Sequence, residues 1–251
     1  MTSSWTVEDS PFGRIVVANS RPPATALFYT TADDSGRLGE DVVDRLREWI
    51  GERFGISIDR FGTCSQIHGT GIQPVTAADS AWCETEGCDA LWTAEPKAGL
   101  GIKVADCLPV ALVDPDAFVI ADIHSGWRGT VKKITERTVS RLREESGFEA
   151  ARAHAYLGPS IRRCCFEVGE EVVDTFIATF GELAWPHIDR SFGPRPHLDL
   201  AALTRDILLQ LGLRSETIHD SELCTRCDGS LFHSYRRSGP GSGRNLAIVA
   251  H

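Results

Sequence analysis

Residues 105–129 read ADCLPVALVDPDAFVIADIHSGWRG, and this stretch predicts a β-hairpin. Its segments 108–113 and 117–123 are rich in Val, Ile, Leu and Phe, which are typical of buried strands. The Asp-Pro-Asp between them, residues 114–116, is typical of a turn. The hairpin therefore indicates a fold built around at least one antiparallel strand pair.

The register of this hairpin decides which side chains meet. If Pro115 and Asp116 are the two central residues of the turn, Cys107 faces His124 across the strands. Facing residues of an antiparallel pair have Cβ atoms about 4.5–5.5 Å apart. A tetrahedral zinc ion needs ligand atoms roughly 3.6 Å apart, so one hairpin can hold a thiolate and an imidazole at ligand spacing.

A third ligand would have to come from elsewhere in the chain. His68 precedes Gly69, and glycine lets the backbone approach a ligand closely. Three protein ligands leave the fourth position open, as a catalytic metal requires. Spacing alone does not choose His68 over the other candidates, which are His154, His219 and His233.

Periodic patterns outside the hairpin predict both helices and strands. Apolar residues at helical spacing predict helices over 40–55, 130–147, 168–181 and 199–212, the last capped by Asp199. The further strands expected are 26–30, 89–93, 152–158, 216–220 and 246–250. Because helices and strands do not alternate strictly, we expect an α+β (mixed α/β) fold with layered mixed sheets flanked by helices.

Composition limits the classes of protein that fit. The chain has 251 residues, 42% hydrophobic and 24% charged, so it can bury a substantial core. Its 26 Lys and Arg against 35 Asp and Glu argue against nucleic acid or anionic membranes as partners. No apolar run approaches the roughly 20 residues of a membrane span, and the first residues lack signal-peptide features. We expect one cytoplasmic domain over 1–251, with an N-terminal strand or arm over 1–25.

Eight cysteines in such a chain favour reduced thiols, metal ligands or a nucleophile over disulfides. One alternative to a catalytic metal is a metal-free cysteine hydrolase, with Cys107 as nucleophile and His124 as base. Another is that Cys107 is a buried core thiol and His124 a loop histidine with its hydrogen bonds satisfied, so that neither has a chemical role. A structural zinc site is also open, from Cys83 and Cys88 with Cys224 and Cys227. Cys164 and Cys165 are expected to be buried or inert.

A copper polyphenol oxidase is the remaining alternative. Multicopper sites need many histidines, and the chain has eight but no His-x-His. A blue-copper site commonly uses an axial methionine, and the only methionine is Met1. These features favour zinc over copper.

Several motifs in order resemble the laccase-domain (YfiH) family of purine nucleoside phosphorylases over roughly residues 60–250. They are QIHGTG (66–71), DALWT (89–93), GIKVADCLPVALVD (101–114), ADIHSGWRGT (121–130), GPSIRRCCFEVGEEV (158–172), LDL (198–200) and SYRRSGPGSGRNLAIV (234–249).

The resemblance implies a YfiH-like mixed α/β domain and an activity. It implies phosphorolysis of adenosine, inosine, guanosine and methylthioadenosine, and deamination of adenosine. Bacterial members are also linked to peptidoglycan editing. The family's zinc ligands correspond to His68, Cys107 and His124, with copper as the alternative metal, and Asp89 matches a family aspartate. Residues 29–41 depart from the family pattern, because they lack its usual Arg and Asn.

Phosphate as a substrate requires cations near the metal. Arg128 follows His124 by four residues and is the first candidate, because guanidinium groups suit phosphate oxygens. Arg236, Arg237 and Arg244 are the next candidates. In a chain of net charge −9 they would have to form a local cluster.

Overall fold

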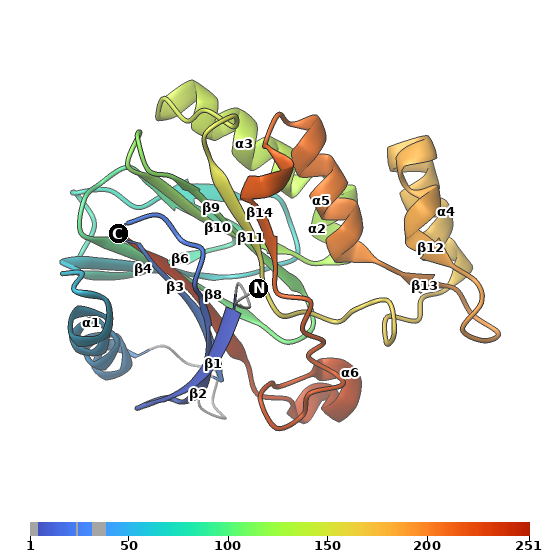
Figure 1. Cartoon of the computed structure of the whole chain (residues 1–251), viewed down its shortest axis with the longest axis horizontal. Helices are drawn as coiled ribbons and strands as arrows, with labels where there is room; N and C mark the ends of the chain where they lie inside the picture. The colour runs from blue at the N-terminus through green and yellow to red at the C-terminus, as the bar shows by residue number, and fades with distance from the viewer. Residues whose placement is uncertain (1–4, 24, 32–38) are drawn as a thin grey trace.

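The structure is a computed structural model that describes residues 5–23, 25–31 and 39–251. Two large β-sheets pack face to face, and helices cover their outer faces (Figure 1). The expected mixed α/β fold with layered sheets is confirmed. No helix in the described part of the chain is long and apolar enough to cross a membrane.

The first sheet has seven strands in the order β1-β2-β3-β15-β8-β4-β6. The pairs from β1 through β8 in this order are antiparallel, whereas β8, β4 and β6 run parallel to one another. The strands are β1 (Trp5–Ser10), β2 (Gly13–Ala18), β3 (Ala26–Thr31), β4 (Arg60–Ser65), β6 (Trp82–Glu86), β8 (Ala98–Val104) and β15 (Asn245–Ala250).

The second sheet has six strands in the order β14-β11-β9-β10-β7-β5. They are β5 (Ile72–Pro74), β7 (Ala90–Thr93), β9 (Leu108–Asp114), β10 (Val119–Ser125), β11 (His154–Leu157) and β14 (Ile218–Asp220), and a small separate pair is formed by β12 (Ile188–Asp189) and β13 (His197–Leu198).

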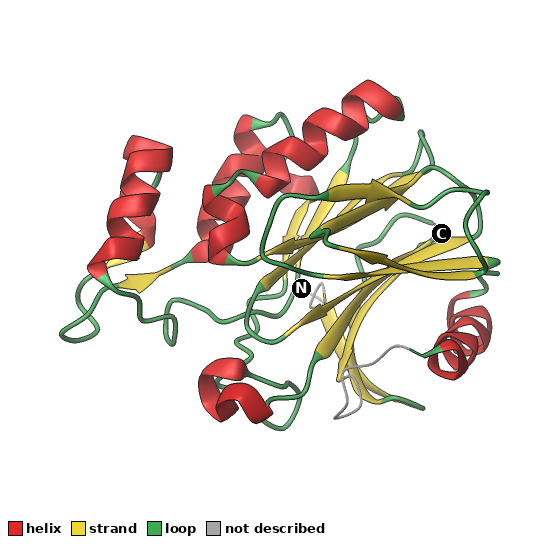
Figure 2. Cartoon of the chain, turned by 180° about the vertical axis from the view of Figure 1, so that it is seen from behind, coloured by secondary structure: helices red, strands yellow, loops and turns green. Residues whose placement is uncertain are grey.

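Apolar faces of the helices hold the outer layers in place. Helix α1 (Glu40–Phe54) buries Leu46 and Ile50 against the first sheet, where Phe28 lies. Helices α3 (Ile134–Glu145) and α5 (Leu200–Gln210) pack on the second sheet (Figure 2). The other helices are α2 (Trp127–Val131), α4 (Glu170–Phe180) and α6 (Tyr235–Ser238), with short 3-10 turns η1 (Gly181–Leu183), η2 (Trp185–His187), η3 (Ser215–Thr217) and η4 (Gly239–Gly241).

One local expectation differs from the structure and another is confirmed. The single helix expected over 130–147 is broken, because Lys133 adopts a left-handed conformation with φ of 65° between α2 and α3. The helix expected over 199–212 is capped as expected, since the Asp199 carboxylate accepts a hydrogen bond from the Ala202 amide.

The register predicted for the β9–β10 hairpin is wrong by two residues. Ser125, not Ile123, pairs with Leu108, because the turn holds four residues rather than two. Proline cannot occupy the tight turn that a two-residue loop prefers. Instead the Asp114 carboxylate accepts hydrogen bonds from the amides of Asp116 and Ala117 and closes a wider turn. A shift of two keeps every side chain on its predicted face.

The chain passes from the first sheet to the second three times at one end. The passages are 66–71 from β4 to β5, 87–89 from β6 to β7, and 105–107 from β8 to β9. Since β4, β6 and β8 are parallel, their carboxyl ends lie together. This places the three passages side by side at one end of the two packed sheets.

The expectation of a single domain over 1–251 stays a prediction. Within its N-terminal arm, β1 and β2 pair antiparallel and extend the first sheet. Most of the segment that departs from the family pattern, 32–38, lies outside the described residues.

Candidate metal site

His68 lies on the first passage, which is folded around a buried carboxylate. The backbone amides of Ile67, His68 and Gly69 donate hydrogen bonds to the Asp89 carboxylate, at 3.3, 2.9 and 2.6 Å. His68 itself has a φ of 58°, so the loop turns sharply and presents its imidazole outward. Asp89, fully buried on the second passage, thus fixes the conformation of the first.

His124 ends strand β10 and is held by the same carboxylate. Its Nδ1 lies 2.8 Å from Asp89 Oδ1, and its backbone amide donates to the Asp89 carbonyl at 2.7 Å. Because a carboxylate can only accept from a ring N–H, Nδ1 carries a proton, and Nε2 is the nitrogen that could bind a metal ion once its own proton is displaced. The hydrogen bond from Nδ1 to a carboxylate orients the ring as it does in ligating histidines.

Cys107 lies on the third passage, just before β9. The preceding residue, Asp106, adopts a φ of 84°, so the chain is not a regular strand there. The Asp106 carboxylate accepts hydrogen bonds of 2.6 Å from the Thr225 hydroxyl and the Arg236 amide, which is a structural role. Opposite Cys107 lies Gly126, where a Cβ would stand 2.8 Å from the cysteine sulfur.

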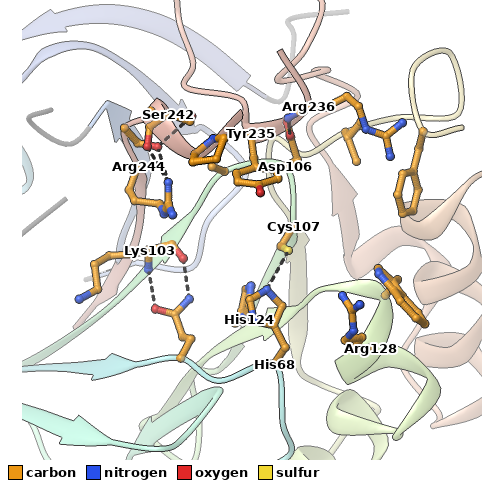
Figure 3. A pocket seen from close by; sticks show the side chains of 18 of the residues that line it. His68, Lys103, Asp106, Cys107, His124, Arg128, Tyr235, Arg236, Ser242 and Arg244 are labelled. Atoms are coloured by element: carbon orange, nitrogen blue, oxygen red, sulfur yellow. Dashed lines mark hydrogen bonds between the residues drawn. The ribbon is translucent and has the colours of Figure 1, made fainter. Parts of the chain in front are cut away.

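The three side chains converge on one point (Figure 3). Cys107 Sγ lies 4.0 Å from His68 Nε2, and the donor atoms of His68, Cys107 and His124 all lie within 4.8 Å of one another. Burial opposes the charged forms of Cys107 and His124, but their hydrogen bonds outweigh it. The pKa of Cys107 falls to about 6 and that of His124 rises to about 9.

This arrangement fits a divalent transition metal. One thiolate and two imidazoles are ligands of catalytic zinc, and they leave a fourth coordination position open. The low pKa of Cys107 supplies the thiolate at neutral pH, and Asp89 supplies the hydrogen bond that orients a ligating histidine. The group can therefore hold a metal ion.

His68, Cys107 and His124 line a pocket of about 1070 Å³. Figure 3 shows Lys103 and Arg244 on one side of the three donors and Arg128 on the other. The Arg128 guanidinium also stacks on the Trp127 ring, 4.4 Å from its centroid. With Arg236, four cations line a pocket whose one acidic side chain among the described residues is Asp106.

Three of the four predicted arginines line the pocket, and the fourth does not. Arg128, Arg236 and Arg244 line the pocket, although Arg236 Nη1 also donates to the Glu167 carbonyl at 3.0 Å. Arg237 is not part of the lining, since its guanidinium donates to the carbonyls of Thr225, Arg226 and Phe232. Arg237 thus stabilises the loop that carries Arg236.

The other candidate histidines lie elsewhere. His154 and His219 stack on each other on β11 and β14, with Nδ1 of His154 3.2 Å from Nε2 of His219. His233 packs against Gly243, behind the 242–244 loop. Neither position brings an imidazole to Cys107.

The proposed zinc set of Cys83, Cys88, Cys224 and Cys227 does not assemble. Cys88 is buried and hydrogen bonded to Cys64, and Cys83 lies apart on β6. Cys224 and Cys227 instead gather with Cys164 and Cys165. Of the two cysteines expected to be buried or inert, Cys165 is buried and Cys164 is exposed, and their inertness stays a prediction.

Two further residues shape the site more than the sequence indicated. Asp89 holds both histidine-bearing segments, and its position directly before a buried strand was the available signal. Lys103 lines the pocket from near the carboxyl end of β8, and its Nζ lies 3.0 Å from Glu84 Oε1. No local motif marks Lys103, because its place depends on how the sheets pack.

Comparison with known proteins places the chain in a class. Residues 29–251 match the family described as multi-copper polyphenol oxidoreductase laccase. The fold and the His-Cys-His group thus belong to a protein of the laccase-domain family, and the chain is a member of it.

Individual members of the family are similar over most of their length. The chain is 33% identical to "Adenosine deaminase RL5" of an unknown prokaryotic organism, covering 84% of each. It is 39% identical to "Purine nucleoside phosphorylase" of Deinococcus radiodurans, over 81% of this chain and 75% of that one. The crystal structure of YlmD from Geobacillus stearothermophilus superposes with a TM-score of 0.83 at 28% identity, covering 99% of both chains.

Proposed function

We propose that this chain is a zinc-dependent purine nucleoside phosphorylase that also deaminates adenosine. The observation that carries the proposal is the convergence of His68, Cys107 and His124 at the wall of a pocket lined by four cations. The names of its relatives, purine nucleoside phosphorylase and adenosine deaminase, support these two reactions.

His68, Cys107 and His124 would hold the zinc ion. When bound, zinc supplies a Lewis acid, which can polarise a substrate atom and activate water. Asp89 holds a proton on Nδ1 of His124, so Nε2 is the nitrogen that would bind zinc, with release of its own proton. Burial opposes ionisation of Cys107, but its hydrogen bonds to His124 and His68 lower its pKa to about 6 and so favour the thiolate that zinc would bind.

The cations of the pocket suit an anionic co-substrate. In phosphorolysis a phosphate oxygen attacks C1′ of the nucleoside, while the bond from C1′ to the purine nitrogen breaks. Arg128 and Arg236 would bind phosphate oxygens, with Lys103 and Arg244 on the opposite side. Tyr235, half exposed in the same lining, offers an aromatic face to the purine.

Deamination uses the same substrate without phosphate. Water adds at C6 of adenosine, ammonia leaves, and inosine forms. The arginines are then dispensable for the reaction itself, although the metal ligands are not. One site thus accounts for both activities.

The test is an assay of metal-stripped and zinc-reconstituted protein with adenosine, with and without phosphate. Adenine and ribose-1-phosphate report phosphorolysis, and inosine reports deamination. Cys107→Ser and His124→Ala should abolish both activities and the zinc of this site, whereas Cys83→Ser, on β6, should change neither.

Three results would overturn the proposal. Full turnover in Cys107→Ser or His124→Ala would exclude this site. Full turnover after chelation would favour a metal-free hydrolase with Cys107 as nucleophile. Enzymatic oxidation of phenols with copper, but no nucleoside turnover with zinc, would favour a polyphenol oxidase, as the family description names.

A further inference from the structure

Four cysteines from two distant segments meet outside the pocket. Cys164 and Cys165 follow strand β11, and Cys224 and Cys227 follow strand β14. Their sulfur atoms all lie within 4.8 Å of one another. The separations are 3.7 Å for Cys164 to Cys165, 3.7 Å for Cys164 to Cys227 and 3.3 Å for Cys165 to Cys227.

These distances match a tetrahedral metal site better than a disulfide. A zinc ion with Zn–S bonds of about 2.3 Å places its four sulfurs roughly 3.8 Å apart. A disulfide brings two sulfurs to about 2.05 Å. Three of the sulfurs lie 3.3–3.7 Å from one another, and the Cys224 sulfur lies within 4.8 Å of all three, so no two of the measured sulfurs form one close pair.

Hydrogen-bond donors lie next to two of the four sulfurs. The Cys224–Cys227 segment forms a tight turn, in which the Asp228 amide donates to the Cys224 carbonyl at 3.0 Å. The backbone amides of Arg162, Cys227 and Arg226 donate hydrogen bonds to the Cys224 sulfur. The Arg226 guanidinium lies 3.5 Å from Cys165 Sγ and offsets negative charge.

The cluster connects two loops that build the pocket wall. Cys165 precedes Phe166, which lines the pocket. Thr225, between the two cysteines of the turn, donates through its hydroxyl to Asp106, the neighbour of Cys107. The Thr225 amide also donates to the Ser160 carbonyl at 3.0 Å. A link between these loops would therefore fix the wall that carries Arg236.

We propose that Cys164, Cys165, Cys224 and Cys227 bind a second zinc ion with a structural role. It is distinct from the ion proposed at His68, Cys107 and His124, because none of the four cysteines lines the pocket. Four protein ligands leave no open position, so this ion takes no part in the chemistry and instead ties the loop 158–168 to the loop 221–234.

The experiment measures zinc per chain by plasma mass spectrometry on protein purified under reducing conditions without chelator. Cys227→Ser and Cys164→Ser should each lose one equivalent of zinc relative to wild type. Cys107→Ser should lose a different equivalent, and the double variant Cys107→Ser/Cys227→Ser should lose both. Cys83→Ser, which lies outside both groups, should keep the wild-type content.

A second measurement keeps the proposal testable if a cysteine variant fails to fold. Cobalt-substituted Cys107→Ser protein should show the intense thiolate-to-metal charge-transfer band and tetrahedral visible bands of a four-thiolate site. Loss of these bands in folded Cys107→Ser would overturn the proposal. So would a thiol count below eight in unreduced, denatured wild-type protein, since it would reveal a disulfide.

Neither measurement depends on nucleoside turnover. An inactive protein with the four-thiolate spectrum would refute the proposed enzyme and leave the second site intact. An active protein in which Cys227→Ser keeps all its zinc would refute only the second site.

Discussion

One oxygen of Asp89 accepts both the Nδ1 proton of His124 and the backbone amide of His68, at 2.8 and 2.9 Å. A single buried carboxylate therefore positions two of the three metal donors. One of them is held through its ring and the other through its main chain. Such partners of ligating histidines typically control metal affinity as strongly as a weak ligand does.

Asp89→Asn should lower zinc affinity and kcat/KM about 10–100-fold, because an amide can present N–H to Nδ1 and favour the wrong tautomer. Competition with a zinc chelator and adenosine kinetics measure the two effects. Asp114→Asn is the control, since Asp114 is equally buried but lies at the turn of the β9–β10 hairpin, away from the metal donors. Equal losses in both variants would show that the effect is a general one of removing a buried charge.

Gly126→Ala should weaken metal binding without unfolding the protein. The new Cβ would stand 2.8 Å from Cys107 Sγ and 3.6 Å from a ring carbon of His68, while the backbone at Gly126 suits alanine. Isothermal titration of metal-free protein with zinc measures the change. Gly51→Ala in helix α1, whose Cβ would meet its nearest atom at 3.7 Å, should bind zinc normally. Unchanged affinity in Gly126→Ala would contradict the close approach.

Arg128→Gln should separate the two activities. Removal of a charge-assisted contact to phosphate costs about 1.5–3 kcal/mol, so kcat/KM for phosphate should fall roughly 10–100-fold. Deamination, which uses no phosphate, should change much less. Arg53→Gln, whose partner Glu8 is on the far sheet edge, is the control for loss of a surface arginine. Equal loss of both reactions would place Arg128 in general substrate binding.

Acid should destabilise the protein through His219. Burial, with the nearby His154, lowers the pKa of His219 to about 4, below the ordinary value near 6.5. Between these values the unfolded chain binds a proton that the folded chain does not, so stability falls as pH drops from about 6.5 toward 4. Thermal unfolding at several pH values should show a shallower decline for His219→Gln. An identical slope in both proteins would contradict the assignment.

Local patterns predicted the strands that are apolar and continuous. The hairpin, β3, β7 and β15 carry Val, Ile, Leu and aromatic residues, and the expected segments coincide with them. The same local patterns did not predict β4 and β8, because glycines in these strands weaken a strand pattern. Gly99 and Gly101 are there because the Phe61 ring of β4 packs on them, within 2.8 and 3.0 Å of where a Cβ would lie. Such a contact between distant segments leaves no local signal.

The candidate site was likewise only partly predictable. Cys107 and His124 share a face under either register, because a shift of two residues preserves the side-chain alternation. His68 followed from the family resemblance, since spacing did not distinguish it from His154 or His219. The meeting of Cys164 and Cys165 with the Cys224–Cys227 turn depends on the parallel pairing of β11 with β14. That pairing joins segments about sixty residues apart, for which the sequence offers no register.

The three passages between the sheets have a consequence for the order of assembly. His68, Asp89 and Cys107 each lie where the chain leaves one sheet for the other, so no single sheet contains the metal site. The site forms only when the sandwich closes. Zinc should therefore slow unfolding and leave the rate of refolding unchanged, because its ligands have not yet come together in the transition state for folding. Loading of the ion would then be a step that follows folding, carried out on a finished protein.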